Sequence, residues 1–249
     1  MSLVNFYEHI DKKYLNQTHI NPHAHVCQHP VRVACVGASG AGKSNSFMNL
    51  LKNMVFDGGI YMVAPCQDQP LYKYLKDNFN KYTPSCKLFE SVDGLPTIEE
   101  IVQQSGGKQV AVCFDDVVTE KRSTQDKIAV FFARGRNANI SCIYLTQVYF
   151  GMVKAVRLNL DFLMIRKIES DDDLSRIIKE NFKGVDKAVA KKMYEAATES
   201  DDITRFLTID KQTTDLNKRY RVGFQFAFRV KPVPEPEPEP KLLVDNEEQ

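Results

Sequence analysis

The sequence predicts an α/β fold in which helices cover both faces of a mostly parallel sheet. Short apolar runs recur along the chain and alternate with segments whose apolar residues recur at helical spacing. Strands that are apolar throughout are typical of parallel sheets, because both faces of such sheets are buried under helices. In addition, a glycine-rich segment lies between the first apolar run and the first helix, where α/β proteins commonly bind phosphate groups.

The first half of the chain is expected to hold two strands and three helices. Residues 31–36 are a β-rich run, and the helix expected at 44–55 carries apolar residues at helical spacing. A Gly-Gly pair ends this helix, so that a second strand follows at 60–65 and a second helix at 68–79. Residues 97–100 form a capping box, in which the first and last side chains bond each other's backbone N–H, so a third helix begins there.

The second half continues this alternation and then changes character. Strands are expected at 109–114, 140–145 and 160–165, with a helix at 123–134 between the first two. After residue 170 the pattern indicates two helices, at 171–182 and 185–199, and a hairpin of strands, at 204–210 and 219–228. We expect this C-terminal helical and hairpin extension to pack on the same core.

Composition divides the chain into three parts. Residues 1–30 form an N-terminal arm that contains all five histidines, residues 31–230 form the body with its extension, and residues 231–249 form a Pro/Glu-rich tail. Proline at every second position of 232–240 excludes helix and sheet, so the tail is expected to be disordered.

Charge is unevenly distributed between these parts. The tail carries two cations and six acids, net −4, which leaves the rest of the chain with 31 cations and 26 acids, net +5. A mildly basic body is compatible with nucleic-acid binding but does not require it. Because no apolar stretch approaches the roughly 18 residues of a membrane span, we expect a soluble protein.

The glycine-rich segment is Gly37-Ala38-Ser39-Gly40-Ala41-Gly42-Lys43-Ser44, which matches the P-loop (Walker A) pattern of nucleoside triphosphatases. In such a loop successive backbone N–H groups bind phosphate oxygens, and the glycines allow the tight curvature. Lys43 is expected to reach the β- and γ-phosphates of ATP, and Ser44 to ligate Mg²⁺. The sequence therefore predicts an Mg²⁺-dependent ATP site.

Two strand ends complete this predicted site. Asp115 and Asp116 follow the apolar run 109–114, where Asp115 is expected to hold Mg²⁺ through water and Asp116 to polarise the attacking water as general base. In RecA-like P-loop proteins of the additional-strand class, the fourth strand inserts between the loop strand and the acidic strand. Gln147, at the tip of that strand, is therefore expected beside the γ-phosphate and the attacking water.

Arginines supply the remaining candidates. Arg134 and Arg136 follow the helix expected at 123–134, and either could be an arginine finger that a neighbouring subunit inserts to neutralise transition-state charge. Arg157 is a third candidate, and the sequence does not choose among the three.

Taken together, these motifs resemble those of the FtsK–HerA superfamily, and in particular the genome-packaging ATPases of large DNA viruses and virophages. The resemblance covers roughly residues 30–170 and rests on the order of five segments, at 37–44, 113–117, 135–141, 145–147 and 157–159. The P-loop by itself marks only a P-loop protein, whereas this order is much narrower. Cellular members usually carry glutamate where this chain has Asp116.

The resemblance implies a homo-oligomeric ring, a hexamer or pentamer, that hydrolyses ATP and threads double-stranded DNA through its centre. Cations in the loops after the acidic strand (Lys121, Arg122) and after Gln147 (Lys154, Arg157) would face the pore and contact phosphates without reading sequence. A capsid or other virion protein would be a partner, and the location would be the viral factory of the host-cell cytoplasm and the virion. A helicase-like or other ring ATPase, and an ATP-binding switch or scaffold with little turnover, stay open as alternatives.

Overall fold

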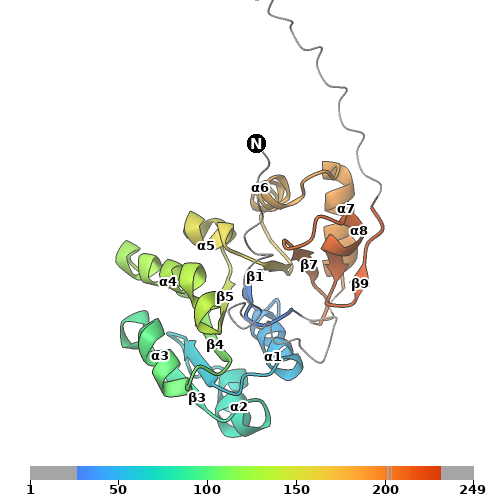
Figure 1. The fold of residues 1–249 in the computed structure, drawn as a ribbon. Helices are drawn as coiled ribbons and strands as arrows, with labels where there is room; N and C mark the ends of the chain where they lie inside the picture. The colour runs from blue at the N-terminus through green and yellow to red at the C-terminus, as the bar shows by residue number, and fades with distance from the viewer. Residues whose placement is uncertain (1–26, 201, 203, 231–249) are drawn as a thin grey trace, which may run out of the picture.

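A nine-stranded sheet forms the centre of the computed structural model, which describes residues 27–200, 202 and 204–230 (Figure 1). Its strands lie in the order β3-β2-β4-β5-β1-β6-β7-β8-β9. They are β1 (Arg32–Val36), β2 (Gly59–Val63), β3 (Cys86–Phe89), β4 (Val110–Asp115), β5 (Ile140–Thr146), β6 (Phe162–Ile165), β7 (Leu207–Asp210), β8 (Tyr220–Val222) and β9 (Phe226–Ala227). The first six strands pair in parallel, which confirms the predicted, mostly parallel α/β fold.

Helices cover both faces of this sheet. They are α1 (Lys43–Asn53), α2 (Pro70–Asn78), α3 (Ile98–Ser105), α4 (Arg122–Arg134), α5 (Lys154–Leu158), α6 (Asp171–Asn181), α7 (Lys187–Thr198) and the single turn α8 (Leu216–Arg219). Alternate residues of β1 enter two separate apolar clusters, because successive side chains of a strand point to opposite faces. One cluster joins Val33 and Cys35 to α1 and α2, and the other joins Ala34 and Val36 to α3 through α7.

The strand order brings together the three chain segments that follow β1, β4 and β5. β5 lies between β1 and β4, as the additional-strand class predicts. The register aligns Val36 with Thr146 and Asp115 with Leu145, so the three strands end at the same level. The loops that follow these strands therefore emerge side by side at the carboxyl edge of the sheet.

The C-terminal extension continues the same sheet with reversed strand direction. β7 pairs antiparallel with β6, opposing Leu207 to Ile165, and β8 and β9 follow it in antiparallel pairing. The expected hairpin is thus present on the common core, with β7 as its first strand. The second expected strand, 219–228, is instead two short strands, β8 and β9, because the chain turns after Gly223, which has a φ of 60°. The expected capping box is also present, since Thr97 and Glu100 each accept a hydrogen bond from the other's backbone N–H.

The strand β3, at one edge of the sheet, was not predicted from the sequence. Its four residues are half-buried or exposed, so they form no apolar run of the kind that marks the central strands. The described residues that precede β1 pack onto the body, because Cys27 and Val31 are almost fully buried. The rest of the expected arm and the expected Pro/Glu tail lie outside the described residues. None of the helices in the described part combines the length and apolar character that a membrane crossing requires.

Candidate functional site

The glycine-rich loop connects β1 to α1 and is anchored to both neighbours of β1. Its first amide, that of Gly37, donates to the Thr146 carbonyl of β5 over 3.2 Å, and the Ala38 amide donates to the Lys167 carbonyl over 2.8 Å. Gly42, the N-cap of α1, has a φ of 88°, in the left-handed region where side chains cause strain. These anchors fix the loop where the dipole of α1 favours bound phosphate.

Lys43 lies across this loop. Its ammonium group donates to the carbonyls of Gly37 and Ala38, over 3.0 and 2.9 Å. Burial lowers the pKa of Lys43, while the nearby carboxylates of Asp115 and Asp116 oppose that shift. The Lys43 ammonium group is therefore held against the loop, where the charges of Asp115 and Asp116 attract it.

Loop, acids and glutamine meet in one pocket of about 310 Å³, a volume near the lower end of ligand sites. It is lined by Ser39, Gly40, Gly42, Lys43, Ser44, Asn45, Gln69, Leu71, Asp115, Asp116 and Gln147. All of these residues except Asn45, Gln69 and Leu71 were predicted from the sequence. A larger groove of about 740 Å³ lies between α1 and the β8–β9 hairpin, but it lacks a P-loop and paired carboxylates. Chemistry, not size, therefore selects the smaller pocket.

The two acidic residues have different environments. Asp115 is almost fully buried, and burial raises the pKa of its carboxyl group above the ordinary value. Asp116 is exposed and has a φ of 54°, a left-handed conformation that costs a non-glycine residue roughly 1–2 kcal/mol. Its amide donates to the Leu145 carbonyl of β5. Such strain is common at functional sites, where it lets a side chain point in a direction that regular backbone geometry would not allow.

Tyr72 of α2 joins this group, although sequence analysis did not include it. Its hydroxyl donates to Asp115 Oδ2 and lies 3.2 Å from Ser44 Oγ. The Ser44 hydroxyl and the Asp115 carboxylate thus lie on either side of the Tyr72 hydroxyl. Both are hard oxygen ligands of the kind that Mg²⁺ prefers. The donor set of Ser44 and Asp115 therefore fits the predicted magnesium ion.

Gln147 lies exposed at the tip of β5 and lines the pocket, with the preceding Thr146 buried. The Thr146 hydroxyl accepts a hydrogen bond from the Val148 amide, which shapes the turn after Gln147. Further along, a Cβ added at Gly151 would lie 2.2 Å from Val118 Cγ2. The loop after β5 thus packs tightly against the loop after β4.

Arg166, just after β6, supports the back of the P-loop and was also missed. It is 2% exposed, and its guanidinium donates to the Ala41 carbonyl over 2.5 Å and to Ser46 Oγ over 3.3 Å. Nothing near Arg166 in the sequence distinguishes it from a surface arginine at the end of a strand. Only the pairing of β6 with β1 reveals its role.

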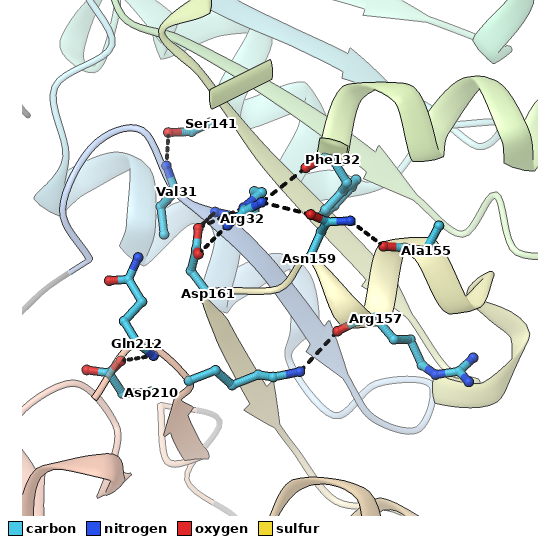
Figure 2. Close-up of polar contacts among 11 residues, drawn as sticks. Val31, Arg32, Phe132, Ser141, Ala155, Arg157, Asn159, Asp161, Asp210 and Gln212 are labelled. Atoms are coloured by element: carbon cyan, nitrogen blue, oxygen red, sulfur yellow. Dashed lines mark hydrogen bonds and ion pairs between the residues drawn. The ribbon is translucent and has the colours of Figure 1, made fainter. Parts of the chain in front are cut away.

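The predicted finger residues lie at the opposite end of the strands, where β1 and β5 begin. Arg136 precedes β5 and lines a pocket of about 500 Å³ together with Arg32, Asp161 and Lys211. Figure 2 shows Arg32 in this region, paired with Asp161 over 2.7 Å and bonded to Asn159 over 3.0 Å. β1 and β5 span five to seven residues, which separates this end from the P-loop by roughly 17 Å or more.

Arg134 lies near the same end of the strands, at the end of α4, in an exposed 2.9 Å ion pair with Glu99 of α3. Within one chain, therefore, the structure brings neither Arg134 nor Arg136 to the nucleotide pocket. A finger role for either residue would require a neighbouring subunit.

The four cations proposed to contact DNA differ in how far they are exposed to solvent. Lys121, Arg122 and Lys154 are exposed, with Lys121 paired with Asp93 and Arg122 with Asp126. The Arg157 side chain is only 15% exposed, because its guanidinium pairs with Glu180 and donates to the Met152 carbonyl. Arg157 is thus held within the fold in this conformation, whereas the other three cations lie on the surface.

Solved structures with a similar fold include viral packaging NTPases and the ATPase EssC. The genome packaging NTPase B204 from Sulfolobus turreted icosahedral virus 2, in complex with ATP-gammaS, aligns with a TM-score of 0.51 and 16% identity, over 82% of this chain and 98% of that one. B204 from Sulfolobus Turreted Icosahedral Virus, described as a DNA-packaging ATPase, gives 0.52 and 14%, over 82% and 98%. EssC (ATPases 2 and 3) from Geobacillus thermodenitrificans gives 0.50 and 12%, over 80% and 40%.

The sequence itself was compared with curated proteins and with protein families. No curated protein matches the chain significantly. The family described as Poxvirus A32 protein matches residues 21–228. This match agrees with the resemblance to the genome-packaging ATPases of large DNA viruses, and the solved structures share the fold. Because the matched range spans well over half of its length, the chain belongs to the Poxvirus A32 protein family.

Proposed function

We propose that this protein hydrolyses ATP to move double-stranded DNA, as a subunit of a viral genome-packaging motor. The observation that carries the proposal is the pocket in which the P-loop, Asp115, Asp116 and Gln147 meet. The structures of the genome packaging NTPase B204 in complex with ATP-gammaS and with AMPPCP support nucleotide binding in a pocket built on this fold.

In the proposed reaction the chain's own residues bind, orient and activate. Lys43 moves from the loop carbonyls to the β- and γ-phosphates. Ser44 and Asp115 would hold Mg²⁺, which would supply positive charge to neutralise the phosphates. Asp116, exposed to the pocket, accepts a proton from the attacking water. Gln147 orients that water and senses the γ-phosphate from the neighbouring strand tip.

Coupling to DNA would run through the loops at the carboxyl edge. The loop after Asp116 and the loop after Gln147 touch at Val118 and Gly151, so a shift of one displaces the other. Lys121, Arg122 and Lys154 flank this contact and can grip phosphates without reading bases. This arrangement favours a motor over a switch or scaffold with little turnover, since the water-activating residues adjoin the loops that carry the cations.

The proposed assembly is a homo-oligomeric ring, hexameric or pentameric, that works with a capsid or other virion protein in the viral factory and the virion. Arg134 and Arg136 lie far from the pocket of their own chain, so a ring is the arrangement in which one of them could reach an ATP molecule. The proposal assigns the finger to this pair in trans.

The test is the ATPase rate of assembled protein with and without double-stranded DNA. We expect stimulation by double-stranded DNA that falls as salt rises, because phosphate contacts release counterions. The double variant Lys121→Glu with Lys154→Glu should keep the basal rate and lose the stimulation by DNA. The control variant, Lys191→Glu on α7, should keep both the basal rate and the stimulation. Equal rates with and without DNA would count against a motor, and stimulation by single strands only would favour a helicase.

A further inference from the structure

Tyr72 of α2 lies where the two proposed magnesium ligands meet. Its hydroxyl donates to Asp115 Oδ2 and lies 3.2 Å from Ser44 Oγ. Because the single hydroxyl hydrogen of Tyr72 is used on the carboxylate, Ser44 must be the donor in the second bond. One tyrosine hydroxyl thus occupies both groups that the proposed function assigns to Mg²⁺.

The place of this hydroxyl is set by helix α2. The Tyr72 side chain is 1% exposed and belongs to the apolar cluster that includes Leu50, Leu75 and Cys113. Its amide donates to the carbonyl of Gln69, the N-cap residue of α2, and Gln69 itself lines the nucleotide pocket. A packed ring has little freedom to swing on its own, so removing the hydroxyl from the site requires the start of α2 to shift.

Asp115 needs a donor when no cation is present. A carboxylate that is almost fully buried is costly to leave without a hydrogen bond. Lys43 does not supply one, since its ammonium donates to the loop carbonyls. Mg²⁺ in proteins keeps several waters and takes carboxylate and hydroxyl oxygens as ligands, so its shell would claim the same oxygens that Tyr72 contacts.

We propose that Tyr72 is a positioning residue of the magnesium site that competes with Mg²⁺ for Ser44 and Asp115. In the absence of Mg²⁺ its hydroxyl holds both side chains in place, and the arrival of Mg²⁺ with ATP displaces the hydroxyl and shifts the start of α2. The inference rests on the proposed function, because it requires Ser44 and Asp115 to bind the ion.

Tyr72→Phe tests the competition, since it keeps the ring and removes the hydroxyl. The readout is the Mg²⁺ concentration that half-saturates binding of ATPγS, followed by calorimetry. We expect this concentration to fall about tenfold, equivalent to about 1.4 kcal/mol, because the competing hydrogen bond to a charged group is gone. Binding of ATPγS in EDTA should not change.

Tyr74→Phe is the matched control. Tyr74 lies on the same helix, is 44% exposed, and its hydroxyl contacts that of Tyr82 at 3.5 Å. This variant should bind Mg²⁺ and ATPγS like wild type. An unchanged or increased Mg²⁺ requirement in Tyr72→Phe would overturn the proposal, since a hydroxyl that merely stabilises α2, or that helps to hold the ion, gives one of those results.

Hydrogen exchange in the wild-type protein gives an independent answer if Tyr72→Phe does not fold. The amides of α2 that follow Pro70, from Leu71 to Asn78, should exchange several-fold faster with Mg²⁺ and ATPγS than with ATPγS in EDTA. Equal or slower exchange would overturn the displacement of Tyr72. Failure of wild type to bind ATPγS under either condition would instead overturn the proposed function, and the inference with it.

Discussion

Gly37 is the first residue of the P-loop, and its replacement by alanine probes how tightly β1 and β6 hold that loop. A Cβ at this position would lie 2.5 Å from Arg166 Cβ, 3.3 Å from its Cγ and 3.4 Å from its Cα. These atoms lie at the backbone end of Arg166, so a rotation of its side chain cannot relieve the contact. β1 and β6 must separate by about 1 Å to restore an ordinary carbon–carbon distance of about 3.5 Å.

The cost can be worked out from what surrounds the contact. Overpacking of a filled interior typically destabilises by about 1–3 kcal/mol. Two backbone hydrogen bonds bracket the position, from Arg166 to Val36 and from Ala38 to Lys167, and their weakening adds about 1 kcal/mol in all. We therefore expect Gly37→Ala to lower the free energy of unfolding by about 2–4 kcal/mol.

Thermal unfolding provides the assay. For a chain of this size 1 kcal/mol corresponds to about 2–4 °C, so the Tm should fall by about 4–16 °C. Gly106→Ala is the control, because Gly106 has a φ of +62° but no atom within 4 Å of an added Cβ. It should cost only the backbone term of about 1–2 kcal/mol. If Gly37→Ala were as mild as Gly106→Ala, the contact with Arg166 would not constrain the loop.

Three further outcomes follow from the site and its surroundings. Asp116→Asn should keep ATP binding and lower turnover by about 10²–10⁴-fold, and hydrolysis near the wild-type rate would move the general base elsewhere. Asp161→Ala should cost about 3 kcal/mol in urea unfolding, because it leaves the largely buried Arg32 guanidinium unpaired, whereas loss of the exposed ion pair in Arg134→Ala should cost under about 1 kcal/mol. Mixing Arg136→Ala with wild-type subunits should lower the ATPase rate below the weighted mean, and a linear response would exclude this finger in trans.

The core of the fold and most pocket residues could be predicted from sequence because they depend on local patterns. The P-loop, the carboxylates after a buried strand and the polar tip of the next strand each lie within a few residues of an apolar run. The strand order of the additional-strand class then brings Asp115 and Gln147 beside the loop, and the structure has that order.

Tyr72 and Arg166 could not be predicted, because their partners are distant in the chain. Tyr72 fits the apolar pattern of α2, and nothing local shows that its hydroxyl meets Asp115, 43 residues away. Arg166 contacts the loop 125 residues before it. Similarly, Arg136 lies close to the site motifs in sequence, but the whole length of β5 separates it from the pocket.

The central claim is that hydrolysis in the P-loop pocket drives movement along double-stranded DNA. Displacement of a fluorescent third strand from a DNA triplex measures such movement directly. We expect displacement by the assembled wild-type protein with Mg²⁺ and ATP, and none with ATPγS or with Asp116→Asn. Active ATP hydrolysis without displacement of the third strand would contradict the account.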